Sequence, residues 1–305
     1  MNDGLSPIVC SSLNIVVFNS LKFRKFVLTR PMTAIYGHRG ARGLYPENTI
    51  QSFLYAAGLG LDGIELDVVI SRDDKVVVSH EPWMNPKTCT KPDNSKVSFL
   101  RRKNLYRMNY DDIKRYDCGQ RGNSGFPEQK KMPAYKPLLA EAIEKVEAFV
   151  KEKNLPLPIY IIEIKSMWIT DDELHPPPLE FVKLVLRELL PFNINSRILI
   201  QSFDMRPLNV LHENNPGFML GMLVRSPRFI KRRMKSLTFT PDTCGTNYKL
   251  TSERWVKKIQ ALGMKSLVWT ENEKGDMLNH LKMGVDGIIT DYPALAIETV
   301  KEFQK

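Results

Sequence analysis

Short apolar runs alternate with helix-like stretches along most of this chain, and this alternation limits the fold more than any other feature. Each run has the length of a buried strand, and from residue 159 onward the runs follow one another at the short spacing of consecutive strand–helix units. Strands that alternate with helices usually pair in parallel. The runs cover residues 34–36, 63–70, 75–79, 159–164, 197–200, 218–224, 243–248, 265–269 and 287–290.

One run does not fit a parallel unit. Only the turn-like residues 71–74 separate residues 75–79 from the run before them, whereas a parallel crossover needs about a dozen residues. We therefore expect residues 75–79 to return antiparallel, as a hairpin. Eight runs remain, and a chain of 305 residues is long enough for a (β/α)8 barrel, which typically has about 250. The sequence predicts an α/β protein with a TIM barrel.

Two segments interrupt the alternation. Residues 82–136 are rich in Pro, Lys and Arg, and we interpret them as an insertion that follows the second barrel strand and caps the mouth of an active site. A helix is expected over residues 136–150, where apolar residues recur at helical spacing. Residues 168–179 contain three consecutive prolines and are expected to form a loop. The barrel domain then spans residues 35–305, and residues 1–34 are an N-terminal extension of unknown role.

Composition narrows the class of protein without selecting a ligand. The hydrophobic fraction of 43% supports a substantial core, and no apolar run approaches the roughly 18 residues of a membrane span. The net charge of +10 is compatible with nucleic acid, an anionic membrane or an anionic small substrate. We recognise no nucleic-acid-binding module. The apolar residues 8–18 precede their basic neighbours, which is the wrong order for a secretory signal, and we expect a cytoplasmic protein.

The four cysteines give little information. Cys10, Cys89, Cys118 and Cys244 lie far apart, with no paired spacing that suits zinc and no dense disulfide framework. The oligomeric state does not follow from the sequence.

Carboxylates stand near the ends of two of the strand-like runs. Glu65 and Asp67 are two residues apart in one run, so their side chains should project from the same face, and two adjacent carboxylates repel unless a cation lies between them or one keeps its proton. Glu163 and Lys165 repeat this spacing. Three carboxylates without a cysteine form a hard, oxygen-rich site, which predicts Mg²⁺ or Ca²⁺. The alternative is a buried ion network that only stabilises the barrel, although burying charges for stability alone is costly.

Two histidines accompany these carboxylates. His38 and Arg39 follow the first run, and the expected hairpin would bring His80 back to the edge from which Asp67 projects. Histidines beside carboxylates favour general acid and base roles, while Arg39 and Lys165 suit an anionic substrate.

Eight motifs, in order, resemble the signature of the glycerophosphodiester phosphodiesterase family over residues 35–300. One departure is visible, because the family commonly has Asp where this chain has Glu81. The motifs are His38-Arg39-Gly40, Pro46-Glu47-Asn48-Thr49, Glu65-Leu66-Asp67-Val68, Val78-Ser79-His80, Glu163-Ile164-Lys165, Gln201-Ser202-Phe203, Trp269-Thr270-Glu271-Asn272 and residues 286–293.

The resemblance implies a TIM barrel enzyme that uses one divalent cation to hydrolyse glycerophosphodiesters to glycerol 3-phosphate and an alcohol. By the same resemblance the metal ligands fall on Glu65, Asp67 and Glu163, and the paired catalytic histidines on His38 and His80. Which histidine is the acid, and whether water or a glycerol hydroxyl attacks first, stays open.

Three further features carry two interpretations each. Trp269 could pack on the glycerol of the substrate or belong to the core. Glu47 could orient a loop or cap the helix that begins near Asn48, and we favour the cap. The basic residues within 225–235 could bind an anionic surface or be a solvated helix face, and we favour the solvated face.

Two other functions compete with hydrolysis of a soluble glycerophosphodiester. A lysophospholipase D or a sphingomyelinase D-type enzyme would use the same chemistry with an apolar groove. The insertion has apolar side chains that could line such a groove or form a small core. A catalytically silent binding barrel would lack at least one site residue, and none is missing. The apolar side chains are Phe99, Leu100, Leu105, Tyr106, Met108 and Phe126.

Overall fold

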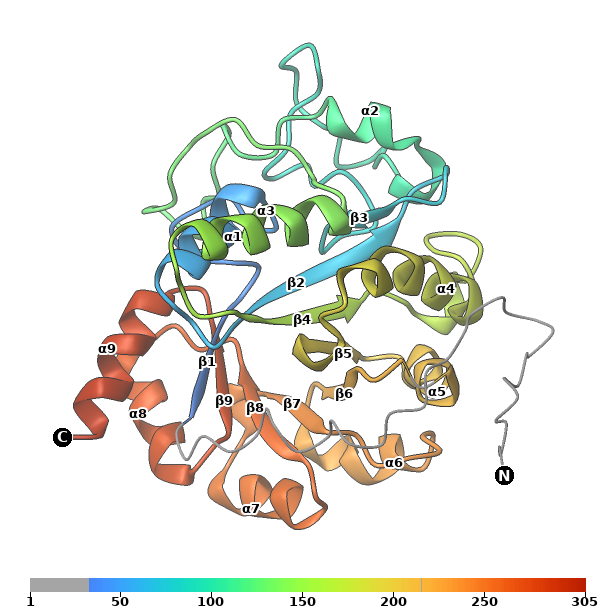
Figure 1. Ribbon diagram of the computed structural model, residues 1–305. Coiled ribbons are helices and arrows are strands. Elements are labelled where there is room, and N and C mark those ends of the chain that lie inside the picture. The colour runs from blue at the N-terminus through green and yellow to red at the C-terminus, as the bar shows by residue number, and fades with distance from the viewer. Residues whose placement is uncertain (1–32, 215) are drawn as a thin grey trace, which may run out of the picture.

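The strands form one sheet that closes on itself in the computed structural model, which describes residues 33–214 and 216–305 (Figure 1). The strand order is β1-β9-β8-β7-β6-β5-β4-β2-β3, and β1 also pairs with β2, which closes the barrel. The predicted TIM barrel is confirmed. The strands are β1 Ala34–Gly37, β2 Gly63–Ile70, β3 Val76–Val78, β4 Ile159–Ile164, β5 Ile198–Ser202, β6 Met219–Val224, β7 Thr243–Asn247, β8 Lys265–Trp269 and β9 Gly287–Thr290.

The expected hairpin is confirmed. Strand β3 pairs antiparallel with β2, with Val78 opposite Val68, whereas the other strand pairs of the described sheet are parallel. Four predicted strands match the observed bounds, and the others differ at an end by one or two residues, as at β5, which continues to Ser202.

Helices surround the barrel (Figure 1). The helix expected over residues 136–150 begins instead at Leu139, because the chain before it is extended along β3, where the backbone N–H of Val78 donates to the carbonyl of Pro137. In the expected loop 168–179, Trp168–Thr170 forms one 3₁₀ turn, and a helix starts at Pro178, a position that suits proline. The helices are α1 Ile50–Gly58, α2 Tyr110–Lys114, α3 Leu139–Glu152, α4 Pro178–Leu189, α5 Met205–Asn214, α6 Ile230–Met234, α7 Glu253–Ala261, α8 Lys274–Met283 and α9 Pro293–Phe303.

Two apolar layers position the strands. The larger layer packs the outer faces of the strands against the helices, and it includes Ile162 and Ile164 of β4. A smaller cluster fills the barrel interior, and it includes Ile161 of the same strand. Because side chains alternate along a strand, Glu163 shares the inward face with Ile161. The same alternation turns Glu65 and Asp67 of β2 inward, since Leu66 belongs to the outer layer.

Residues 82–136 have little regular structure and lie on the side of the barrel formed by β2 and β3 (Figure 1). Their apolar side chains form a separate cluster with Val69 and Val77. A disulfide joins Cys89 to Cys118, a pairing that the cysteine spacing did not predict. The role of this insertion as a cap stays a prediction, and the expected extension 1–34 lies almost wholly outside the described residues.

No helix in the described part of the chain is both long enough and apolar enough to cross a membrane.

A tight turn after β1 aims the backbone toward β2. Arg39 and Gly40 both have positive φ values, 49° and 86°, a conformation that favours glycine. A Cβ atom at Gly40 would lie 2.7 Å from the backbone carbonyl carbon of Ser52 in α1. This turn lets the backbone N–H of Arg39 donate to the Glu65 carboxylate over 2.9 Å.

We expect Gly40→Ala to destabilise the protein more than Gly284→Ala, as measured by the free energy of unfolding. Gly284 also has a positive φ, 75°, but nothing lies within 4 Å of its Cβ position. Backbone strain alone should cost Gly284→Ala about 1 to 2 kcal/mol. Gly40→Ala adds a collision with α1 and should cost at least about 1 kcal/mol more. Equal losses for the two variants would show that the approach of the turn to α1 is not tight.

Candidate active site

Three carboxylates meet inside the carboxyl end of the barrel. Asp67 of β2 lies in register with Glu163 of β4, and Glu65 lies two residues before Asp67. All three side chains are buried, and one oxygen from each lies within 4.8 Å of the others. No other group of this kind was found among residues 33–214 and 216–305.

The electrostatics of these carboxylates differ. Burial, together with the neighbouring charge of Asp67, raises the pKa of Glu65 well above its usual value. Burial also acts to raise the pKa of Asp67, but the charges of Lys165 and Arg39 outweigh it and hold that pKa well below its usual range. The pair therefore shares its negative charge unequally, with Asp67 ionised and Glu65 resisting ionisation.

Two cationic side chains lie against this cluster. The ammonium of Lys165 lies 2.6 Å from Glu163 and 3.4 Å from Asp67, and the guanidinium Nε of Arg39 lies 3.2 Å from Asp67. Burial acts to lower the pKa of Lys165, but Glu163 and Asp67 more than compensate and raise it. Both predicted anion-binding residues are thus beside the three carboxylates.

His38 lies at the same edge with its ring oriented by Asp291. Its Nδ1 is 2.7 Å from the Asp291 carboxylate, and its Nε2 is 3.9 Å from that of Glu65. Burial lowers the pKa of His38 to about 4, although Asp291 opposes this effect. Burial would raise the pKa of Asp291, but His38 and Arg42 hold it below its usual range. Asp291 therefore accepts the hydrogen bond from Nδ1–H, and Nε2 of the neutral ring carries no proton.

His80 returns to this edge through the hairpin. The backbone N–H of Ser79 donates to the carbonyl of Asp67, and the Nδ1 atom of His80 lies 3.0 Å from the Glu81 carboxylate. Burial acts to raise the pKa of Glu81, but the hydrogen bond to His80 outweighs it and lowers the pKa to about 2. Glu81 therefore contacts His80 directly even though it is longer than the Asp that the family commonly has.

The interpretation of Glu47 as a helix cap was wrong. The cap of α1 is Thr49, whose side chain accepts a hydrogen bond from the backbone N–H of Ser52. The carboxylate of Glu47 instead lies 3.0 Å from Arg39, because the loop turns it toward the guanidinium. Glu47 thus pairs with Arg39 of the loop after β1, in line with the less favoured interpretation, that it orients a loop.

Sequence reasoning missed three polar residues of the site. Asn48 donates from its side chain to Asp67 over 2.9 Å, and Asp291 holds His38. Both lie in the quoted motifs, so the motifs gave a signal although no role was drawn from it. The third is Lys136, a buried cation that donates to the Ser79 hydroxyl over 2.8 Å, and burial lowers its pKa. Nothing in the basic insertion distinguished Lys136 from its exposed neighbours.

Trp269 ends β8 and packs edge-on against Phe203, with ring centroids 5.6 Å apart. It also borders the interior cluster of the barrel. Its indole N–H is buried and has no hydrogen-bond partner among the described residues. Buried indole N–H groups usually have a partner, so the position suits contact with a bound polar molecule as well as core packing.

The apolar side chains of the insertion divide between the two predicted uses. Leu105 is buried in the separate cluster of the insertion, and Met108 packs against that cluster. Tyr106 packs against the main core. Phe99 and Leu100 are exposed, at 55% and 97%. Phe126 lies against the ring of Tyr292, with centroids 6.3 Å apart. Only Leu105 and Met108 of the six therefore belong to the small core of the insertion.

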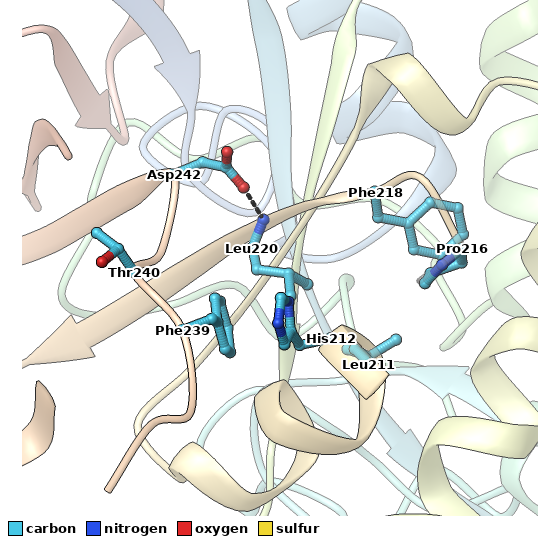
Figure 2. Close-up of a pocket in the computed structure, with 8 residues that line it drawn as sticks. All are labelled: Leu211, His212, Pro216, Phe218, Leu220, Phe239, Thr240 and Asp242. Carbon is cyan, nitrogen blue, oxygen red and sulfur yellow. Dashed lines mark hydrogen bonds between the residues drawn. The ribbon is translucent and has the colours of Figure 1, made fainter. Parts of the chain in front are cut away.

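A cavity of about 260 Å³ lies at the opposite end of the strands (Figure 2). Phe218 and Leu220 reach it from the start of β6, and the ring of His212 stacks on Phe239. The carboxylate of Asp242, just before β7, accepts a hydrogen bond from the backbone N–H of Leu220 over 2.8 Å. This cavity has no part in the carboxylate cluster.

The residues present fit a divalent cation. Three buried carboxylates with converging oxygens are hard donors, and burial together with the charge of Asp67 raises the pKa of Glu65 although Arg39 lies nearby. A bound cation between Glu65, Asp67 and Glu163 would relieve the repulsion between these carboxylates.

Known proteins resemble this chain in sequence and in structure. The model of the glycerophosphoryl diester phosphodiesterase family matches residues 38–295. A glycerophosphodiester phosphodiesterase of Caldanaerobacter subterraneus is 30% identical, over 88% of this chain and 98% of that protein. A lysophospholipase D of Mus musculus is 26% identical, over 87% of this chain and 84% of that protein.

A solved structure of an Oleispira antarctica phosphodiesterase, in complex with the product sn-glycerol-3-phosphate, shares the fold. Its TM-score is 0.70 at 21% identity, and the match covers 88% of this chain and 97% of that one. Because the family model spans most of the chain, from the first site histidine to the start of the last helix, this enzyme belongs to the glycerophosphoryl diester phosphodiesterase family.

Proposed function

We propose that this enzyme hydrolyses small glycerophosphodiesters to glycerol 3-phosphate and an alcohol with the help of one divalent cation, Mg²⁺ or Ca²⁺. The observation that carries the proposal is the cluster of Glu65, Asp67 and Glu163 at the barrel end, between two cationic side chains and two histidines. A phosphodiester is an anion, and it gains charge on its nonbridging oxygens during attack. The family match supports this substrate class.

Charge stabilisation is the first contribution of the site. When bound by Glu65, Asp67 and Glu163, the cation would act as a Lewis acid toward the phosphoryl oxygens. Arg39 and Lys165 lie beside the same carboxylates, and their side chains would bind the remaining oxygens of the phosphate. Glu47 keeps Arg39 in place through its 3.0 Å ion pair.

His38 is the proposed general base. Its pKa, lowered to about 4, keeps the ring neutral at physiological pH, and Asp291 fixes the tautomer that leaves Nε2 free to accept a proton. The proton comes from the attacking group, which is either water or the neighbouring glycerol hydroxyl.

His80 is the proposed general acid. Because Glu81 stays ionised and bonds to Nδ1, it can hold the protonated ring in place, and Nε2–H is left to donate to the departing alkoxide. Trp269, with its unpartnered indole N–H, would contact the glycerol part of the substrate.

Lysophospholipid hydrolysis is the second candidate, and the exposed Phe99 and Leu100 together with the lysophospholipase D relative favour it. It needs the same groups at the phosphate and an additional apolar surface. A cytoplasmic location stays a prediction.

We expect the purified enzyme to release glycerol 3-phosphate from glycerophosphocholine faster than it cleaves lysophosphatidylcholine, as followed by ³¹P NMR. Glycerophosphocholine gives glycerol 3-phosphate, whereas a lysolipid cleaved at the same bond gives a glycerol phosphate that keeps its acyl chain. The phosphorus spectra distinguish these two products. Cleavage of the lysolipid alone would replace the first candidate with the second.

We expect Mg²⁺ or Ca²⁺ to raise the unfolding temperature of the wild-type enzyme. At a cation concentration of a hundred times Kd, the free energy of unfolding should increase by about 2.7 kcal/mol. Without a cation, Glu65→Gln should be as stable as the wild type or more so, because the raised pKa of Glu65 means that its charged form is unfavourable in the fold. Addition of a cation should stabilise Glu65→Gln only slightly.

The control is Glu144→Gln, which removes an exposed carboxylate on α3 and should leave the cation effect intact. A marked loss of stability in cation-free Glu65→Gln would instead support the buried ion network.

We expect His38→Ala to abolish turnover without unfolding the protein, and Asp291→Asn to lower kcat/KM by about a hundredfold or more. The change His212→Ala, at the opposite end of the barrel, is the matched control and should have no effect. Circular dichroism would verify that each variant is folded. Full activity in His38→Ala would exclude this histidine as the base.

The pH dependence tests the same role. Since the pKa of His38 lies near 4, its neutral form persists as the pH falls to about 5, and kcat/KM should decline only below that value. An ordinary histidine, with a pKa of about 6.5, would place the decline above pH 6. An acid limb near pH 6.5 in the wild-type enzyme would contradict the lowered pKa of His38.

A further inference from the structure

Large apolar side chains are exposed on three loops around the mouth of the barrel. Met167, Trp168 and Ile169 follow β4 and are 51%, 73% and 58% exposed, while Phe229 follows β6 at 40% and Leu250 follows β7 at 53%. Loops that follow parallel barrel strands lie on one face, which here is the face of the carboxylate cluster. We call these five side chains the apolar rim.

The segment between β6 and β7 is highly basic. It begins at this face with Arg225 and Arg228, and α6 then leads toward the opposite end of the barrel, where Phe239 lines the cavity. Residues 225–241 contain six cationic side chains and no acidic one, and all six are exposed. Within the described residues, none of the six forms an ion pair, and Lys249 beside Leu250 is a further exposed cation. We call the six the basic segment; they are Arg225, Arg228, Lys231, Arg232, Arg233 and Lys235.

The apolar rim and the basic segment interleave. The guanidinium of Arg228 lies 5.2 Å from the centre of the Phe229 ring, so a cation of the basic segment lies directly beside a side chain of the apolar rim. Acidic groups on the rim loops are fewer: Asp171 is paired with Arg206 at 2.6 Å, and only Asp172 and Glu173 add to it on the β4 loop. The face therefore carries a net positive charge around exposed apolar groups.

Such a surface fits one class of partner better than others. Exposed apolar side chains enter the boundary between headgroups and acyl chains, where tryptophan is favoured, and nearby cations attract anionic headgroups. A nucleic acid would bind the cations and could stack on Trp168 and Phe229, but it would leave the aliphatic side chains of Met167, Ile169 and Leu250 in water. Charge complementarity and aliphatic exposure together favour a lipid surface.

We propose that this face docks on membranes that contain anionic phospholipids, with the apolar rim inserted among the headgroups and Arg225 and Arg228 of the basic segment against their charges. Docking of this kind turns the mouth of the barrel, with Glu65, Asp67 and Glu163, toward the lipid. The proposal goes beyond hydrolysis and is independent of it, because docking requires no turnover.

The first test is co-sedimentation of the full chain with vesicles of phosphatidylserine and phosphatidylcholine, compared with phosphatidylcholine alone. We expect binding to the mixed vesicles and much weaker binding to the neutral ones. Trp168→Ala should weaken binding about tenfold or more, and Arg225→Gln with Arg228→Gln about fivefold for each charge removed. Unchanged binding in these variants, or no binding by the wild type, would overturn the proposal.

Matched controls lie away from the mouth. Leu157 and Leu262 are 58% and 43% exposed but precede β4 and β8, at the other end of the strands, so Leu157→Ala and Leu262→Ala should bind as the wild type does. Lys151→Gln with Lys282→Gln removes two exposed cations from α3 and α8 and is the control for charge. An equal loss of vesicle binding in the controls and in the rim variants would overturn the proposal that this particular face binds the membrane.

A second readout locates the contact. Brominated lipids in the mixed vesicles should quench the fluorescence of Trp168, and Trp168→Phe should keep the binding but lose most of the quenching. Each rim variant should still cleave soluble glycerophosphocholine, which separates a failure of docking from a failure of the enzyme. Binding to RNA that the arginine changes abolish and Trp168→Ala leaves intact, without vesicle binding, would assign the face to nucleic acid instead.

Discussion

The repulsion among three buried carboxylates is the constraint on which the rest of the site depends. Strand register places Asp67 beside Glu163, and side-chain alternation turns Glu65 inward with them. Like charges at this depth are unfavourable unless cations offset them. Arg39 and Lys165 offset part of the charge, while burial and the charge of Asp67 still raise the pKa of Glu65. The fold thus leaves these carboxylates with fewer neighbouring positive charges than they need, and a divalent cation would supply them.

The loop after β1 positions several of the side chains that surround the three carboxylates. The positive φ of Arg39 and Gly40 turns the backbone N–H of Arg39 toward Glu65, while its side chain reaches Glu47 and Asp67. Asp291, which follows the neighbouring strand β9, bonds to His38 in the same loop. The pairing of the first and last strands therefore brings Asp291 to His38, beside the carboxylate cluster.

Much of this could be predicted from the sequence, because short-range rules govern it. The period of two along β2 and β4 determined which carboxylates face inward, and the short link after β2 required the hairpin that returns His80. Their meeting at one edge then followed from the parallel topology. The motifs named the family, and the family match agrees.

What the sequence did not reveal depends on contacts across the chain. Glu47 stands where a helix cap is common, and only the folded loop shows that it binds Arg39. Lys136 looks like one basic residue among many until the insertion packs it beside Ser79. The bond between Cys89 and Cys118 likewise depends on how an irregular segment folds over β2 and β3. Residues in such segments have no period from which their neighbours could be inferred.

Crystallographic location of a cation would test whether the three carboxylates form a metal site. In crystals grown with Ca²⁺, we expect an ion bound by oxygens of Glu65, Asp67 and Glu163 at about 2.3–2.6 Å, with Lys165 moved away from Glu163. An intact contact between Lys165 and Glu163 at saturating Ca²⁺, with no ion among the three carboxylates, would contradict this expectation.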